Sequence, residues 1–327
     1  MLSRALTRRA FSQATLPSLT SPGTNYTVRN QLFINGEWTD AKDGKTFDVV
    51  NPGTGEFITK VASGGQEDIN AAVAAAKKAG RAWASTSPME RNRIMLKFAD
   101  KLEQNADEIA TLECEDNGKP YSDAMGDVMF SASLMRYYGG HAMNIEGMAA
   151  MRDNEHMYKN CYAYTRKEPV GVCGLITPWN FPLLMTALKI APMMASGCTG
   201  VSKLPELTPL SSLRFIEMLH EVDGMIPGVV NAVPGLGSEA GEALVDHPDV
   251  RKIAFTGSTA VGKSIMRKSA DSMKRVTLEL GGKGPLIVFG DADVPKAIGT
   301  AIGCGMANSG QFCGASTRII VEESVYD

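Results

Sequence analysis

The fold is most clearly encoded in residues 170–204, VGVCGLITPWNFPLLMTALKIAPMMASGCTGVSKL, which predict an apolar strand, an apolar helix and a second strand. The same alternation continues to residue 280. Strands are expected at 170–177, 198–204, 228–233, 251–255 and 275–280, and helices at 181–197, 208–222, 238–247 and 258–270. This spacing predicts βαβ units and a parallel sheet, whose ligands bind at the carboxyl ends of the strands.

The flanking segments predict an α/β protein in two parts. Before residue 150 the sequence favours short strands, turns and helices. We therefore assign residues 21–150 and 169–281 to a Rossmann-like, cofactor-binding domain built on the parallel sheet. The polar, β-like segment 151–168 interrupts it, and residues 282–327 begin a second α/β domain that we expect to be incomplete.

The composition argues against several classes of protein. The 327 residues carry a net charge of −3, which provides no general attraction for nucleic acid. No apolar run is long enough to cross a membrane as a helix. The six cysteines form no CxxC pairs and the four histidines lack ligand spacing, so no metal site and no disulfide scaffold is predicted. A reducing compartment is favoured.

The N-terminus has the composition of a mitochondrial transit peptide. Three arginines lie within the first nine residues, among apolar and hydroxyl residues, and the first acidic residue is Glu37. This pattern predicts a transit peptide and disordered N-terminus over residues 1–20, with cleavage after Phe11 and a location in the mitochondrial matrix. The alternative is a disordered tail that is basic by chance.

Glu279 and Cys313 form the most informative pair of reactive residues. Glu279 ends an apolar strand in LELGGK, and Cys313 lies in GQFCGA after a segment rich in Gly and Ala. An exposed thiolate is a nucleophile, and a nearby carboxylate can remove a proton from a thiol or a water molecule. The pair therefore suggests acyl chemistry through a thioester. The alternatives are a surface acid and a small core cysteine.

A glycine-flanked turn predicts an anion site. Residues 257–264, GSTAVGKS, match the Walker A pattern GxxxxGK followed by Ser or Thr. A P-loop NTPase usually places this motif on its first strand, whereas here it follows the fourth, so that alternative is disfavoured. The free N–H groups at a helix N-terminus suit a dinucleotide pyrophosphate equally well. A second glycine-rich turn, PGLGSEAG at 234–241, is as consistent with close packing as with binding.

The second strand ends in KLPE, with Lys203 and Glu206. An acidic group at a strand end can accept hydrogen bonds from ribose hydroxyls, and it repels a 2′-phosphate. The motif therefore favours NAD over NADP. A solvated charge pair is the alternative.

Five motifs in order resemble the aldehyde dehydrogenase superfamily, in particular its NAD-dependent mitochondrial and cytosolic members. They are TPWNFP (177–182), KLPE (203–206), FTGSTAVG (255–262), LELGGK (278–283) and GQFC (310–313). The resemblance covers nearly everything from about residue 32 to residue 327. It implies that Cys313 is the nucleophile, that Asn180 stabilises the oxyanion and that Glu279 activates water for hydrolysis.

The same resemblance implies a set of residues around bound NAD. These are Ile176, Thr177, Trp179, Lys203, Glu206, Gly237, Gly241, Phe255, Gly257, Ser258, Val261 and Leu280, and Gly262 closes the glycine-flanked turn.

The expected function is therefore NAD-dependent oxidation of an aldehyde to a carboxylic acid, through a thiohemiacetal and a thioester on the cysteine. The alternatives are a CoA-acylating aldehyde dehydrogenase and a non-catalytic NAD-binding fragment. The resemblance implies a C-terminal truncation, an oligomerisation hairpin over residues 151–168 and a homo-oligomer in the full-length form. We accordingly expect the isolated chain to be poorly active or prone to aggregate.

Overall fold

The computed structural model describes residues 13–17, 25–151 and 162–326. The predicted cleavage site after Phe11 and residues 1–12 of the predicted transit peptide lie outside the described residues. Residues 13–17 differ from the predicted disorder, because they form β1 (Gln13–Pro17), whose backbone pairs antiparallel with β2 (Asn25–Arg29).

The predicted parallel sheet is confirmed. Within the described residues, the largest sheet has seven strands in the order β13-β12-β9-β10-β11-β3-β4. Its parallel strands are β9 (Val172–Ile176), β10 (Thr199–Leu204), β11 (Val230–Pro234), β12 (Val250–Gly257) and β13 (Arg275–Leu280). The short hairpin of β3 (Leu32–Ile34) and β4 (Glu37–Thr39) extends the β11 edge antiparallel. The chain builds outward in both directions from β9, which makes the β9–β12 boundary a topological switch point.

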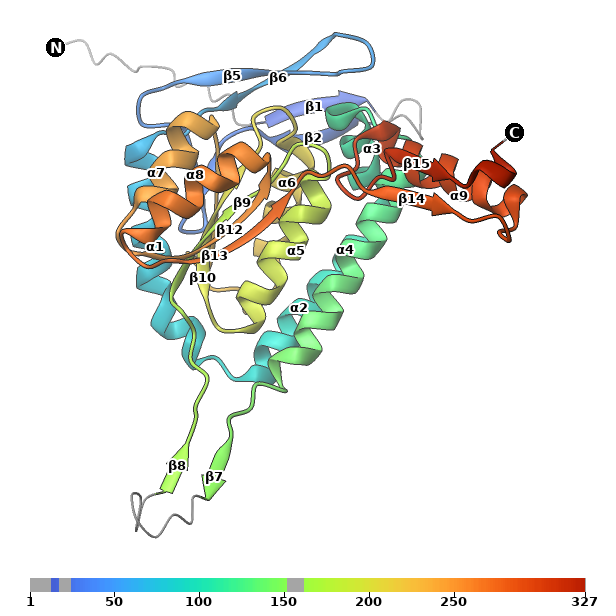
Figure 1. Cartoon of the computed structure of the whole chain (residues 1–327). Helices are drawn as coiled ribbons and strands as arrows, with labels where there is room; N and C mark the ends of the chain where they lie inside the picture. Colours follow the sequence, from blue (N-terminus) through green and yellow to red (C-terminus); the bar gives the residue numbers. More distant parts are fainter. Residues whose placement is uncertain (1–12, 18–24, 152–161, 327) are drawn as a thin grey trace, which may run out of the picture.

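Helices cover both faces of this sheet, as Figure 1 shows. One face carries α1 (Gln66–Ser85), the short α7 (Glu242–Asp246) and α8 (Thr259–Ala270). The other carries α5 (Pro182–Ala195) and α6 (Leu210–His220), backed by α2 (Pro88–Gln104), α3 (Ala106–Asn117) and α4 (Tyr121–Ala142). The middle strands β9, β10 and β11 are buried along their whole length, because both of their faces are covered.

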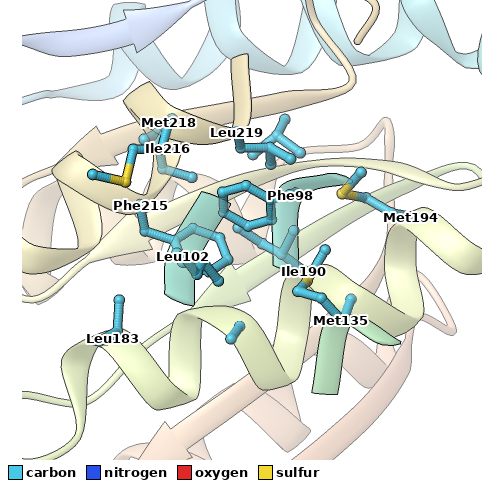
Figure 2. Close-up of a cluster of buried hydrophobic side chains, with 14 of the residues drawn as sticks. Phe98, Leu102, Met135, Leu183, Ile190, Met194, Phe215, Ile216, Met218 and Leu219 are labelled. Carbon is cyan, nitrogen blue, oxygen red and sulfur yellow. The ribbon is translucent and has the colours of Figure 1, made fainter. Parts of the chain in front are cut away.

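The larger part of the core lies among the helices on the α5 face. Figure 2 shows side chains from α2, α4, α5 and α6 meeting in one cluster. Phe98 of α2 and Phe215 of α6 pack edge to face there, with ring centroids 4.7 Å apart. This packing fixes α5, and with it the loop that leads into α5 from β9.

One predicted helix differs in detail. The segment 238–247 starts as a π-helical turn, η1 (Gly237–Gly241), and only then continues as α7. Glycines at both ends of η1 weaken the preference for a regular α-helix and leave the backbone free to widen. No helix in the described part of the chain is long and apolar enough to cross a membrane.

Besides the β1–β2 pair, two further hairpins in the described residues lie outside the large sheet. β5 (Thr46–Val50) pairs with β6 (Phe57–Ala62), and β7 (Ala149–Met151) pairs with β8 (Tyr162–Tyr164). Figure 1 shows β7 and β8 projecting away from the body of the molecule. Their connection, residues 152–161, lies outside the described residues, and the role of this hairpin in oligomerisation stays a prediction.

The last segment forms a small unit of its own. β14 (Pro285–Val288) and β15 (Arg318–Val321) pair in parallel, and between them run α9 (Val294–Met306) and the 3₁₀ turn η2 (Ala307–Gly310); η3 (Glu323–Val325) follows. No residue of α9 is buried, and its apolar side chains Ile298 and Ile302 are more than half exposed. Figure 1 shows this unit extending to one side of the helical layer.

Candidate active site

A cavity of about 700 Å³ opens at the carboxyl ends of β9, β10, β12 and β13. Every residue that the sequence predicts for catalysis or cofactor binding lines it. These are Cys313, Glu279, Asn180, Ile176, Thr177, Trp179, Lys203, Glu206, Gly237, Gly241, Phe255, Gly257, Ser258, Val261 and Leu280. Residues from six separate stretches of sequence are thus brought to one place. Gly262, which the sequence predicts to close the glycine-flanked turn, is not among the residues that line the cavity.

The loop after β9 is held by hydrogen bonds to neighbouring elements. Thr177 donates to the carbonyl of Lys203 from its N–H at 3.3 Å and from its Oγ1 at 3.2 Å. The carbonyl of Trp179 accepts from Asn117 Nδ2 at 2.7 Å and from Thr208 Oγ1 at 2.9 Å. The backbone that leads to Asn180 is therefore fixed from both sides.

The strand end of β10 presents a paired cation and anion. Lys203 Nζ donates to Glu206 Oε2 at 2.9 Å, and the lysine is buried whereas the glutamate is half-buried. The pair lines the cavity, as the prediction of a ligand-binding acid requires, whereas the alternative was a charge pair on the outer surface. Its carboxylate is available to hydroxyl groups of a ligand.

The turn from β12 into α8 has the form of an anion site. Ser258 is the N-cap of α8, and its Oγ accepts a hydrogen bond from the N–H of Val261 at 3.3 Å. The remaining N–H groups of this first turn have no partner within the helix itself. Gly262 explains how closely α8 packs, because a Cβ at this position would lie 2.6 Å from Leu280 Cδ2.

The cysteine loop and the Asn180 loop touch directly. Asn180 Nδ2 donates to the carbonyl of Gln311 at 2.8 Å, two residues before the exposed thiol of Cys313. A carboxamide carries two N–H donors, so one remains for a ligand oxygen. Phe312 packs edge to face with Phe181, with ring centroids 5.7 Å apart. The loop that carries the Cys313 thiol is thereby joined to the Asn180 carboxamide, by a bond between residues 131 positions apart in the sequence.

Glu279 lies beside a lysine that sequence analysis missed. Strand β13 alternates, so Glu279 lies on its exposed face, opposite Thr256 of β12 in the parallel pairing. Lys189 of α5 is buried and donates from Nζ to Thr256 Oγ1 at 2.7 Å. Burial lowers the pKa of Lys189 to about 8, although the negative charge of Glu279 acts in the opposite direction. A single lysine within the apolar helix 181–197 is the signal that could have revealed it.

Other lining residues were also missed, and most adjoin a predicted one. They are Pro178, Pro205, Leu207, Ser238, Glu242, Val245, Thr256, Ser264, Ile265, Lys268 and Gly281. Ser264, Ile265 and Lys268 follow Val261 at helical spacing, so the face of α8 predicts them once Val261 is assigned. Among the described residues, no group of three or more His, Cys, Asp or Glu side chains is arranged to hold a metal ion.

Comparison with known proteins gives a consistent result. Residues 38–327 match the aldehyde dehydrogenase family. The chain is 48% identical over 299 residues to an aldehyde dehydrogenase of Alternaria alternata, covering 90% of this chain and 59% of the relative. It is 44% identical over 328 residues to the human mitochondrial aldehyde dehydrogenase, covering 98% of this chain and 62% of the relative.

A solved NAD⁺ complex of an aldehyde dehydrogenase from Bacillus cereus superposes with a TM-score of 0.86 at 46% identity, over 90% of this chain and 60% of that one. The chain thus spans about three fifths of the length of the relatives it matches. With the parallel sheet, the cavity and the match over residues 38–327 in agreement, the chain belongs to the aldehyde dehydrogenase family.

Proposed function

We propose that this chain carries the site for NAD-dependent oxidation of an aldehyde to a carboxylic acid. The observation that carries the proposal is that one cavity is lined by a nucleophile, a carboxylate and an amide donor, Cys313, Glu279 and Asn180. Beside them lie the lining residues expected for a dinucleotide. An oxidation of this kind needs all four parts within reach of one carbonyl carbon.

The lining residues have the chemistry that binding of NAD requires. Apolar walls are provided by Ile176, Phe255 and Leu280, and the N-terminus of α8 offers N–H groups to a pyrophosphate. Glu206 is placed to accept from ribose hydroxyls and to disfavour a 2′-phosphate. When bound, NAD supplies the acceptor for the hydride that leaves the substrate carbon.

The protein groups have distinct tasks in this proposal. The thiol of Cys313 gives its proton to water, Sγ adds to the aldehyde carbon, and the carbonyl oxygen becomes an oxyanion that the free N–H of Asn180 stabilises. Loss of the hydride leaves a thioester on Cys313. Glu279 then takes a proton from water, whose oxygen attacks the thioester carbon. The C–S bond breaks, the carboxylic acid leaves, and the thiol is restored.

A single-turnover trap tests the proposal, and it does not require the chain to be a fast enzyme. The variant Glu279→Gln is mixed with acetaldehyde and NAD, quenched in acid and digested for mass spectrometry. We expect an acetyl group on Cys313 and about one NADH per chain, because hydrolysis is blocked after acyl transfer. Cys313→Ser is the matched control and should give neither product.

The other outcomes distinguish the alternatives. NAD binding without any adduct on Cys313 would refute the oxidation and favour a non-catalytic NAD-binding chain. Acetyl groups that leave the unmodified chain only when CoA is added would favour the CoA-acylating reaction, in which the thiol of CoA replaces water. Release of acetate without CoA supports hydrolysis by Glu279.

We further infer that the chain is addressed to the mitochondrial matrix. The support is the arginine-rich, acid-free N-terminus and the mitochondrial names of relatives from human and Arabidopsis thaliana, which are 44% and 45% identical. Import of the chain into isolated mitochondria, with loss of about eleven residues as predicted for cleavage after Phe11, tests this. A chain that stays outside and uncut would contradict it.

A further inference from the structure

We propose that Asn308, held by Asp123, is a positioning residue that ties the nucleophile loop to the loop carrying the oxyanion donor. The inference rests on the proposed function, because it explains how Cys313 and Asn180 keep their relative geometry. Neither Asn308 nor Asp123 lines the cavity. Both would therefore act through other residues and not by contact with the reacting atoms.

Asn308 joins three segments through one buried side chain and its own backbone. Its Nδ2 donates to the carbonyl of Asn180 at 2.8 Å and to the carbonyl of Gln311 at 3.2 Å. Asn180 Nδ2 donates to the same Gln311 carbonyl at 2.8 Å. The backbone N–H of Asn308 donates to Asp123 Oδ2 at 3.0 Å, in the first turn of α4. Asn308 is only 2% exposed, so water does not compete readily for these bonds.

The backbone at this point is held in an unusual conformation. Asn308 and Ser309 have φ values of 55° and 57°, and Gly310 follows with 78°. Two successive non-glycine residues in the left-handed region cost free energy that other contacts must offset. The hydrogen bonds of Asn308 are the contacts available to offset it, and the resulting sharp turn directs the chain toward Gln311 and Cys313.

Little else anchors this loop from its N-terminal side. Helix α9, which leads into the loop, has no buried residue within the described chain. Its residues are at most half-buried, so their packing constrains the position of Cys313 only weakly. We infer that the hydrogen bonds from Asn308 to Asp123 of α4 and to Asn180, which together form the tie, hold the loop in position instead. The tie also links the nucleophile to the helical core, because α4 contributes Met135 to the cluster in Figure 2.

The test compares two reactions of the same thiol. Acetylation of Cys313 by p-nitrophenyl acetate forms an S–C bond and breaks the ester C–O bond, releasing p-nitrophenolate, and the thiol proton passes to water. It proceeds through an oxyanion, so it depends on the Asn180 donor. Alkylation by iodoacetamide forms an S–C bond and releases iodide without an oxyanion. Because Glu279 can hydrolyse the acetyl group, the acetylation rate constant is taken from the initial release of p-nitrophenolate that is absent in Cys313→Ser. The alkylation rate constant is measured at Cys313 by peptide mass spectrometry, and the ratio of the two reports the alignment of the donor.

Three variants and one matched control test the hydrogen bonds of Asn308. Asn308→Gly keeps the left-handed backbone and the N–H to Asp123 but removes the amide. Ser309→Gly is the matched control, because it changes an exposed neighbour with the same φ. Asp123→Ala removes the acceptor, and Asp123→Asn restores an oxygen that can accept. We expect Asn308→Gly to lower the acetylation-to-alkylation ratio about tenfold to a hundredfold. Asp123→Ala should act in the same direction, and Asp123→Asn should recover most of the loss.

Control measurements keep the outcomes separate. The NAD dissociation constant of each variant should stay within about twofold of the unmodified chain, because the cavity is untouched. Backbone amides of residues 311–314 should exchange with D₂O at least about tenfold faster in Asn308→Gly than in Ser309→Gly. If Asn308→Gly keeps both the acetylation-to-alkylation ratio and the amide exchange rates of the unmodified chain, the positioning role of Asn308 is refuted and the proposed function is unaffected.

A different pattern would count against the proposed function. If the unmodified chain shows no higher ratio than the free thiol of glutathione, the oxyanion site is not operating. The exchange rates then decide the tie by themselves, since faster exchange in Asn308→Gly supports it and equal exchange overturns it.

Discussion

Replacing Lys189 with methionine should change how the stability of the protein depends on pH. Lys189 Nζ is buried against Thr256 at 2.7 Å, and burial lowers its pKa from 10.5 to about 8. The folded state therefore loses this proton near pH 8, whereas the unfolded chain keeps it to about pH 10.5. Between these values the unfolded state holds more protons, so the free energy of unfolding rises with pH.

The magnitude follows from the two pKa values. The full difference corresponds to about 3 kcal/mol, and about 2 kcal/mol of it is realised between pH 7.5 and 9.5. The methionine variant has no proton to release at this position. The difference in stability between Lys189→Met and the unmodified chain should therefore move by about 2 kcal/mol in favour of the unmodified chain over this range.

Urea unfolding of both proteins at pH 7.5 and 9.5 measures this difference, and groups that titrate equally in the two proteins cancel. Lys78→Met is the matched control, because Lys78 is an exposed lysine on α1. The reasoning would be refuted if the difference in the free energy of unfolding between Lys189→Met and the unmodified chain stayed constant to within about 0.5 kcal/mol across the two pH values. It would mean that the ammonium is hydrated in the folded state and not buried beside Glu279.

Two further predictions concern the frame of the site. Lys119 Nζ donates to Glu113 Oε1 at 2.8 Å and to Asp127 Oδ2 at 2.7 Å, so Lys119→Met should leave two buried carboxylates without their cation and destabilise the chain by about 3–5 kcal/mol in urea unfolding. A loss below about 1 kcal/mol would contradict this. Ser258→Ala removes the N-cap of α8 and should cost about 0.5–2 kcal/mol, with weaker NAD binding in a titration. Unchanged stability and affinity would show that the cap does not shape the turn.

The architecture was predictable because its signals are local. Four of the five parallel strands, β9 to β12, are each followed by a helical segment, and the spacing of apolar residues in the strands differs clearly from that in the helices. The antiparallel addition of β3 to β11 was not predictable, because it pairs Phe33 with Ala232, far apart in the sequence. A pairing of this kind depends on which sheet edge remains uncovered, and no short window of sequence contains that information.

The site was predictable to the extent that its residues end strands or begin helices. Lys203, Glu279 and Ser258 all lie at such boundaries, where polar groups in an otherwise apolar pattern stand out. Lys189 lies inside a helix and Asn308 inside a glycine-containing turn. Their importance comes from partners that only the fold brings near, namely Thr256 for the first and Asn180 for the second.

The two halves of the chemistry depend on different kinds of interaction. The cavity opens at the carboxyl ends of β9, β10, β12 and β13, and β9 and β10 are buried along their whole length, so close packing maintains that part of its wall. Cys313 lies on a segment whose preceding helix, α9, has no fully buried residue. This segment contacts the body through the Phe312–Phe181 ring pair and through two hydrogen bonds, from Asn180 Nδ2 to the Gln311 carbonyl and from the N–H of Asn308 to Asp123. Because local stability varies across a fold, cofactor binding and nucleophile alignment need not be lost together. Binding of NAD by this chain is therefore no measure of whether its thiol is correctly placed, and the two properties have to be tested separately.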